Sequence, residues 1–395
     1  MYDVFIRRTI MKKITKLFAV VLSTAMIVAS FAGCGNTAKG GETWKIGGIG
    51  PTTGGAAVYG IAVQNGADLA IKEINEAGGI NGYKIEYNFQ DDELDSEKSV
   101  NAYNALKDWG MNILVGSVTS GCCVAVAAES VNDNMFQITP SGSAVDCIAN
   151  KNVFQVCFTD PNQGIGAASY IGGNNVASKV AVIYDSSDVY SSGIYQKFAQ
   201  EAANQPFDIV SAEAFTADSK TDFSVQLQKA ADAGAELVFL PIYYTEASLI
   251  LTQAASAGYS FKFFGCDGLD GILGVENFDT SLAEGVMLLT PFAADAADTK
   301  TQNFVKAYEA AYGDTPNQFA ADAYDAIYII KAAIEKANIT PSASVSEIGD
   351  ALEKAMTEIT VDGLTGEAMS WSADGSVNKA PKAMEIKNGN YSLIQ

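Results

Sequence analysis

Histidine is absent from this chain of 395 residues. Its absence excludes the Ser-His and Cys-His mechanisms of hydrolases, because no imidazole is there to act as the general base. Zinc and haem sites built on histidine ligands are excluded for the same reason. Any catalysis would have to rely on Asp, Glu, Lys, Tyr or Cys side chains.

Basic residues are scarce, since 25 Lys and Arg stand against 46 Asp and Glu, for a net charge of -21. Residues 1–33 hold five of the basic residues and one of the acidic ones, so the rest of the chain carries -25. A surface this acidic repels phosphate backbones, and no nucleic-acid partner is expected. The composition, 48% hydrophobic and 18% charged, is typical of a folded globular protein. The length predicts about two domains.

Only one long apolar run occurs, the 17 residues Leu17–Gly33, and basic residues precede it. This pattern predicts a secretory signal peptide over residues 1–33, with the true start at Met11. A membrane span would need about 20 apolar residues. The run ends in Phe31-Ala32-Gly33-Cys34, which resembles a bacterial lipobox. We therefore predict a lipidated Cys34, a flexible tether over residues 34–42 and an extracytoplasmic protein anchored to the bacterial cell membrane.

The other cysteines lack the CxxC spacing of metal and redox motifs. They number five, so at least one thiol is unpaired in a monomer. Small buried hydrophobic residues are the favoured interpretation for most of them, and pairing of Cys122 or Cys123 with Cys147 stays open. The five are Cys122, Cys123, Cys147, Cys157 and Cys266.

Strand-like segments alternate with helical patterns along the chain. Repeated βαβ units predict parallel sheets covered by helices, and a second series begins after Asp160. The two series predict two doubly wound lobes, with ligands bound at the carboxyl ends of the strands. The predicted strands are 45–49, 84–89, 112–115, 135–139, 179–184, 209–215, 236–240, 261–264 and 286–289. The predicted helices are 58–76, 96–109, 121–132, 191–205, 221–233, 246–257, 302–312 and 320–337.

The most specific stretch is residues 49–82, IGPTTGGAAVYGIAVQNGADLAIKEINEAGGING, followed by Gln90-Asp91-Asp92 and by GSVTSG at 116–121. These motifs resemble the leucine/isoleucine/valine-binding protein family of ABC transporter receptors, and the resemblance covers nearly the whole chain after the leader. It implies an α/β type I periplasmic-binding-protein fold, with two doubly wound lobes joined by a three-segment hinge. The predicted lobes are 43–160 with 291–363, and 161–290 with 364–395. Crossings are predicted near Asp160–Pro161, Thr290–Pro291 and Gly363–Gly366.

Three serines mark a candidate carboxylate site. Ser120 stands between a predicted strand and a helix that begins near Gly121, where free backbone N–H groups and a hydroxyl attract an anion. Ser141 and Ser143 follow the next strand and should reach the same crevice. The resemblance implies that these three residues hold the α-carboxylate of an amino acid. Ordinary helix capping is the alternative for each serine taken alone.

Asp267 follows a predicted strand of the second lobe, in the sequence Phe264-Gly265-Cys266-Asp267-Gly268. The resemblance implies a carboxylate here that pairs with the ligand's α-ammonium, although the family usually has Glu. A buried ammonium needs such a counter-charge. The alternative is a turn aspartate before glycine. We expect the Asp267 carboxylate to be solvated while the cleft is empty.

Three tyrosines complete the candidate site. The resemblance implies that Tyr59, Tyr190 and Tyr243 surround the ligand, with Tyr244 as the alternative to Tyr243 because neighbours on a strand point oppositely. Core packing is the other interpretation, since the chain has 17 tyrosines. No Lys or Arg sits beside these positions in the sequence, which argues against an anionic ligand side chain.

The resemblance thus implies a solute-binding lipoprotein of an ABC importer. It would bind a small neutral, branched-chain amino acid and deliver it to permease subunits, as a monomer without cofactor, metal or catalysis. Three alternatives stay open: a receptor for short amides or urea derivatives, a ligand-sensing receptor of the same fold, and an enzyme using Asp, Tyr or Cys266 in the cleft. The glycines of Gly48–Gly54 fit a dinucleotide loop poorly, because the third comes one residue late.

Overall fold

A computed structural model describes residues 42–394. The predicted signal peptide, Cys34 and residues 35–41 lie outside the described residues. Within 42–394 no helix is both long enough and apolar enough to cross a membrane.

The first sheet has five parallel strands in the order β2-β1-β3-β4-β5. They are β1 (Trp44–Gly50), β2 (Ile85–Asp91), β3 (Ile113–Val115), β4 (Gln137–Thr139) and β5 (Val153–Gln155). The connecting helices are α2 (Ala57–Glu76), α3 (Ser96–Trp109) and α4 (Ser120–Asp133). The strand order reverses between β1 and β3, which creates a crevice at the carboxyl ends of these strands.

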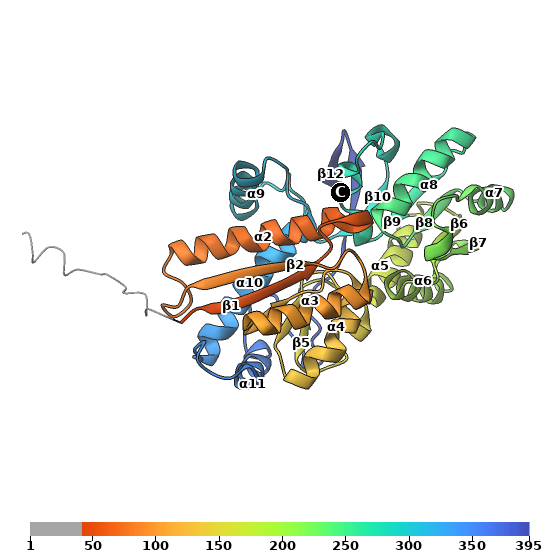
Figure 1. Ribbon diagram of the computed structural model, residues 1–395. Helices are drawn as coiled ribbons and strands as arrows, with labels where there is room; N and C mark the ends of the chain where they lie inside the picture. Colours follow the sequence, from red (N-terminus) through yellow and green to blue (C-terminus); the bar gives the residue numbers. More distant parts are fainter. Residues whose placement is uncertain (1–41, 395) are drawn as a thin grey trace, which may run out of the picture. The chain divides into compact units, whose positions relative to one another are not determined.

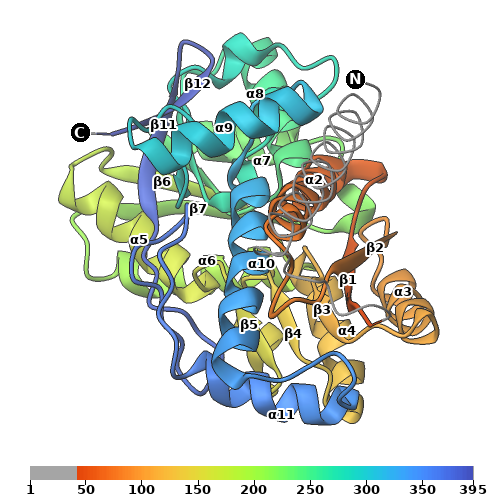
Figure 2. The same ribbon diagram turned by 90° about the vertical axis from the view of Figure 1, so that its left-hand side faces the viewer.

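Helices cover both faces of this sheet. α2 lies beside α10 (Gln318–Ala337) on one face, and α3 lies beside α4 on the other (Figures 1 and 2). α2 and α10 approach closely at Gly66, where a Cβ atom would stand 2.1 Å from the Ala320 carbonyl oxygen. α9 (Thr299–Tyr312) packs on α2, and α11 (Val345–Met356) packs on α10. We call this sheet with its helices the first lobe.

The second sheet has seven strands in the order β12-β11-β10-β9-β8-β6-β7. Five are parallel: β6 (Lys179–Asp185), β7 (Asp208–Phe215), β8 (Leu237–Leu240), β9 (Lys262–Gly265) and β10 (Met287–Thr290). The antiparallel pair β11 (Lys382–Lys387) and β12 (Asn390–Leu393) extends the edge at β10. The helices are α5 (Asp160–Gly173), α6 (Val189–Ala202), α7 (Ser224–Asp232) and α8 (Tyr244–Ala257). This second lobe repeats the topology of the first.

The last passage between the sheets comes later than predicted. The Trp371 indole N–H donates to the Gln155 carbonyl on β5 over 2.7 Å, and the Gln155 N–H donates to the Gly375 carbonyl over 3.0 Å. Residues 364–378 therefore pack on the first sheet, and the chain joins the second sheet only at Lys382. The predicted crossing at Gly363–Gly366 is corrected accordingly. The other predicted lobe boundaries stay predictions.

A buried ion pair fixes this passage. The Lys379 ammonium lies 2.8 Å from Asp322 Oδ1 on α10 and donates to the Val156 carbonyl over 2.9 Å. It also donates to Thr365 Oγ1 over 2.5 Å, and both charged side chains are 2% exposed. Asp325, one turn along α10, accepts hydrogen bonds from the Leu364 and Thr365 N–H groups. One lysine thus holds α10, the end of β5 and the last passage together.

Candidate binding site

The three predicted serines lie at the carboxyl ends of β3 and β4. Ser120 is the first residue of α4, and its Oγ accepts hydrogen bonds from the N–H groups of Ser143 and Ala144 over 3.1 and 3.2 Å. Ser141 Oγ donates to the Val118 carbonyl over 2.7 Å. Ser143 Oγ is buried and lies beside the Asp160 carboxyl, but it makes no hydrogen bond of good geometry within residues 42–394. The crevice side of the first lobe is therefore lined with hydroxyl groups beside a helix start.

The second lobe presents Asp267 in the turn after β9. The Tyr190 hydroxyl, from the first turn of α6, donates to Asp267 Oδ1 over 2.7 Å and accepts from the Gly268 N–H over 2.9 Å. Asp267 is only 4% exposed, which contradicts the expectation of a solvated carboxylate. Burial raises its pKa to about 6, against the opposing effect of the Tyr190 hydrogen bond. The reason for the difference is that aromatic side chains close over the carboxylate.

Tyr59 joins the two lobes. Its hydroxyl donates to the Gly268 carbonyl over 2.5 Å and accepts from the Tyr244 N–H over 3.3 Å. Its ring lies 5.6 Å from the Tyr243 ring in an edge-to-face arrangement, and Tyr243 stacks on Tyr190 at 4.9 Å. These contacts bring an aromatic residue of α2 against two of the second lobe, Tyr243 and Tyr244.

Six of the seven predicted ligand-binding residues line one small cavity: Tyr59, Ser120, Ser141, Tyr190, Tyr243 and Asp267. Ser143 does not line the cavity itself, but its N–H donates to the hydroxyl of Ser120, which does. Tyr243 is the lining residue of the pair left open by the sequence. Tyr244 packs its buried ring on Tyr59, and its hydroxyl accepts the Val58 N–H over 3.1 Å. The cavity volume is about 10 Å³, room for one water molecule. A larger molecule enters only if these side chains or the lobes move apart.

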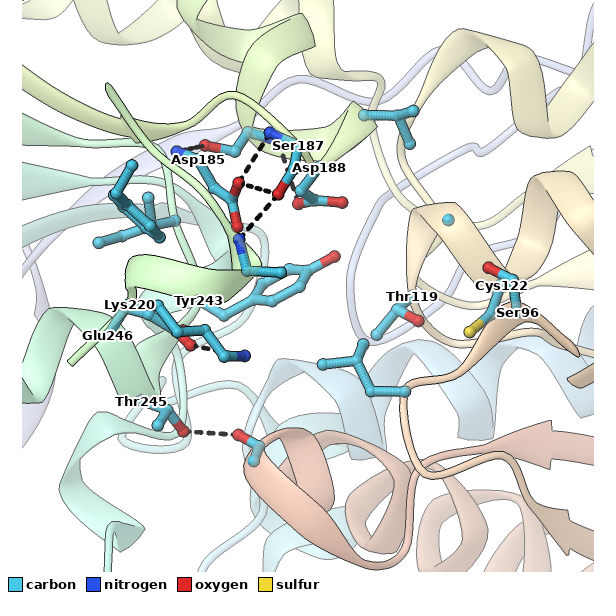
Figure 3. A pocket seen from close by; sticks show the side chains of 18 of the residues that line it. Ser96, Thr119, Cys122, Asp185, Ser187, Asp188, Lys220, Tyr243, Thr245 and Glu246 are labelled. Atoms are coloured by element: carbon cyan, nitrogen blue, oxygen red, sulfur yellow. Dashed lines mark hydrogen bonds and ion pairs between the residues drawn. The ribbon is translucent and has the colours of Figure 1, made fainter. Parts of the chain in front are cut away.

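A larger cavity of about 690 Å³ adjoins the small one and shares Thr119 and Tyr243 with it. Figure 3 shows Ser96 and Cys122 on one wall and Asp188, Lys220 and Glu246 on the other. The Lys220 ammonium lies 3.2 Å from Glu246 Oε1. Burial raises the pKa of the Asp188 carboxyl to about 6. The only lysine that lines either of these cavities among the described residues is therefore already paired with a carboxylate.

Sequence reasoning missed Asp160 as a buried carboxylate next to the site, which lines neither cavity but lies beside Ser143. It opens α5, is 2% exposed, and neither of its carboxyl oxygens has a hydrogen-bond partner of good geometry within residues 42–394. Ser143 Oγ lies beside it, and burial raises the pKa of its carboxyl well above the usual value. The only signal in the sequence is the Asp160-Pro161 pair, which predicts a chain crossing. Val118, Thr119, Gly268 and Phe319 also line the small cavity and were not predicted.

The glycine-rich stretch near β1 is a packing feature. A Cβ atom at Gly48 would stand 2.4 Å from the Phe89 ring, and one at Gly50 would stand 2.4 Å from Val118. These glycines therefore let β1 approach its neighbours closely. All five cysteines of the described segment are free and buried, so no disulfide links Cys122 or Cys123 to Cys147. Residues 42–394 also hold no cluster of Cys, Asp and Glu arranged for a metal ion.

Known proteins share this architecture and are similar to this chain in sequence. The family model described as periplasmic binding protein matches residues 43–390. The Leu/Ile/Val-binding protein homolog 3 of Brucella melitensis is 32% identical over 341 residues, which cover 83% of this chain and 89% of that protein. The chain belongs to the Leu/Ile/Val-binding protein family.

Two further relatives agree with this membership. The leucine-, isoleucine-, valine-, threonine- and alanine-binding protein of Pseudomonas aeruginosa is 30% identical, over 85% of this chain and 87% of that protein. The crystal structure of the substrate-binding protein LivJ from Streptococcus pneumoniae, in complex with isoleucine, superimposes with a TM-score of 0.81 at 29% identity. That match covers 89% of this chain and 99% of LivJ. The fold is therefore the type I periplasmic-binding-protein fold, as the resemblance implied.

Proposed function

We propose that this protein is the extracytoplasmic solute-binding component of an ABC importer and captures a small neutral amino acid of the branched-chain type. One observation carries the proposal: the hydroxyl-lined start of α4 on the first lobe faces a buried carboxylate, Asp267, on the second. A helix start with hydroxyl groups stabilises a carboxylate, and Asp267 supplies a counter-charge for an ammonium group. Ser120, Ser141 and Ser143 would hold the carboxylate of the ligand, and Asp267 would pair with its ammonium group.

The rest of the proposal follows from this arrangement. Asp160 would add a second carboxylate beside the ammonium, and Tyr59, Tyr190 and Tyr243 would rearrange around the ligand. Closure of the lobes over the ligand would create the form that the permease subunits recognise. The protein would act as a monomer without cofactor or catalysis. The names of its relatives, which bind leucine, isoleucine and valine, support this ligand class.

Thermal unfolding of ligand-stripped protein tests the proposal. Leucine, isoleucine or valine should raise the melting temperature, because only the folded form binds. Titration calorimetry then ranks the neutral amino acids. A complete neutral amino-acid panel without any shift, alongside a clear shift with a sugar or a nucleotide, would reject the proposal.

Short amides are the second candidate ligands, because hydroxyl groups line the small cavity and an amide can both donate to them and accept from them. Acetamide and urea belong in the same panel. They carry no charge, so replacing Asp267 by Asn should alter their binding far less than the binding of an amino acid. A shift with acetamide but with no amino acid would favour this candidate.

Membrane attachment is a separate part of the proposal and rests on Cys34, outside the described residues. Expressed with its leader in a lipoprotein-processing bacterium, the protein should incorporate labelled fatty acid and sediment with membranes. Cys34→Ser should release it without changing ligand affinity, while Cys122→Ser should stay bound. A Cys34→Ser protein that still carries the label would contradict the anchor.

A further inference from the structure

Thr119 has a buried hydroxyl group whose polar neighbour is only a thiol, that of Cys122. It occupies the N-cap position of α4, yet its side chain caps no helix N–H group. The residue is 3% exposed, and its Oγ1 makes no hydrogen bond of good geometry within residues 42–394. The Cys122 thiol lies beside it, but a thiol is a weak hydrogen-bonding group. A hydroxyl buried in this way is costly unless something else pairs with it.

The position of Thr119 shows what that partner could be. Thr119 lines both the small cavity, with Ser120 and Asp267, and the larger cavity of about 690 Å³. Figure 3 shows it across the larger cavity from Tyr243, the other residue that lines both spaces. An amino acid whose charged groups meet Ser120 and Asp267 would direct its side chain along this boundary. Thr119 would then be in contact with the first atoms of that side chain.

We propose that Thr119 is a specificity-determining residue that favours a ligand side chain bearing a hydroxyl group, so that threonine binds more tightly than valine. This inference rests on the proposed function, since it assumes an amino-acid ligand. An aliphatic ligand side chain would pack on the Thr119 hydroxyl without forming a hydrogen bond to it. A hydroxyl on the ligand removes that cost by forming a hydrogen bond with Thr119.

Threonine and valine are matched probes, because they have nearly the same shape and differ by a hydroxyl in place of a methyl group. Titration calorimetry on the ligand-stripped mature chain should give a lower Kd for threonine, by roughly 5- to 100-fold. Thr119→Val should abolish or reverse this preference, and Thr119→Ser should keep it. The control is Thr252→Val, on the exposed side of α8, whose hydroxyl bonds only within its helix and should leave both affinities unchanged.

The outcomes separate the inference from the proposed function. Valine binding as tightly as threonine to the unmodified protein would overturn the inference alone. A threonine preference that survives in Thr119→Val would also overturn it, since another group would then read the hydroxyl. If neither amino acid binds to the folded protein, the proposed function falls and this inference falls with it.

Discussion

The hydroxyl of Tyr190 donates a hydrogen bond to Asp267 Oδ1 over 2.7 Å, inside the second lobe. The carboxylate that would pair with a ligand ammonium therefore has a hydrogen-bond partner within the protein itself. A ligand must compete with the tyrosine hydroxyl or share the carboxylate with it. This relationship makes Asp267 the most informative residue to change.

Asp267→Asn should weaken binding of the cognate amino acid strongly. The variant keeps the side-chain volume but removes the counter-charge of the ammonium. Truncating one member of a buried charge pair costs about 2–5 kcal/mol. Titration calorimetry on ligand-stripped protein should therefore show a loss of roughly 30-fold to several thousand-fold in Kd. Unchanged affinity would mean that the ammonium is held elsewhere or that the ligand has none.

The matched control for this prediction is Asp208→Asn, an exposed aspartate at the start of β7. It changes the net charge equally and should leave affinity unaltered. The ligand-free Asp267→Asn protein should be at least as stable as the unmodified one at pH 7.5. The reason is that the substitution removes a charge that burial destabilises.

Affinity should rise with pH through the titration of Asp267. A proton on its carboxyl group competes with the ligand ammonium, and burial raises the pKa of this group to about 6. Affinity at pH 5 should therefore be about tenfold lower than at pH 7.5. Calorimetric titrations across this range test the profile, and the affinity of Asp267→Asn should depend on pH less than that of the unmodified protein, since Asp160 still titrates in the variant. A flat profile in the unmodified protein would contradict the assignment of Asp267.

The ligand-free fold should respond to pH in the opposite direction. The pKa values of Asp267, about 6, and Asp270, about 7, lie above the ordinary value of 3.8, so the folded protein binds more protons than the unfolded chain in this window. The contribution of these groups to stability is lost as pH rises through their folded pKa values. Scanning calorimetry should show a higher melting temperature at pH 5.5 than at pH 7.5. A melting temperature that falls on acidification would argue against this linkage.

Sequence patterns predicted most of the fold because its elements carry strong local signals. The helix predicted at 96–109 is α3 to the residue, since apolar spacing and the Asp95 cap mark its ends. β5, by contrast, was not predicted, because a strand of only three residues is too short to show an alternation of apolar and polar side chains. α11 was missed although it begins with a capping box of Ser344 and Glu347, a signal that the sequence does contain.

The site residues that directly follow a strand could be predicted from the sequence. The features of the site that depend on packing between distant segments could not. Ser120 and Asp267 each follow a strand, and the fold brings such ends together. The unpaired state of Asp160 depends on how α5 sits against the first lobe, which no local pattern encodes. The burial of Asp267 likewise depends on Tyr59 and Tyr190, which reach it from 208 and 77 residues away in sequence.

Lys379→Met should destabilise the fold severely. Asp322 would keep its buried carboxyl group but lose its ion-pair partner, and the buried Asp325 carboxyl would lose the nearby positive charge that lowers its pKa. Breaking a buried ion pair on one side costs about 3–5 kcal/mol. Urea unfolding measures the loss. The control is Lys331→Met, which removes an exposed i,i+4 pair with Glu335 on the same helix as Asp322 and should cost under about 0.5 kcal/mol. Equal effects of the two variants would contradict the structural role of Lys379.

Two hydrogen bonds between the lobes should hold them together without ligand. Thr245 Oγ1 donates to the Gly55 carbonyl over 2.5 Å, and the Tyr244 hydroxyl accepts from the Val58 N–H over 3.1 Å. The double variant Tyr244→Phe with Thr245→Val removes both, at about 1 kcal/mol each. The open form should then gain population, and ligand affinity should fall by roughly 5- to 30-fold because closure becomes less favourable.

Small-angle scattering of the ligand-free double variant tests this prediction, since open lobes give a larger radius of gyration. Saturating ligand should restore the compact value, because binding energy drives closure. Tyr259→Phe is the control, as it removes a tyrosine hydroxyl whose bond to Gln228 stays within the second lobe. If the double variant scatters like the unmodified protein and binds equally well, the lobes are held by the aromatic contacts of Tyr59 rather than by these two bonds. The bonds would then accompany closure without determining it.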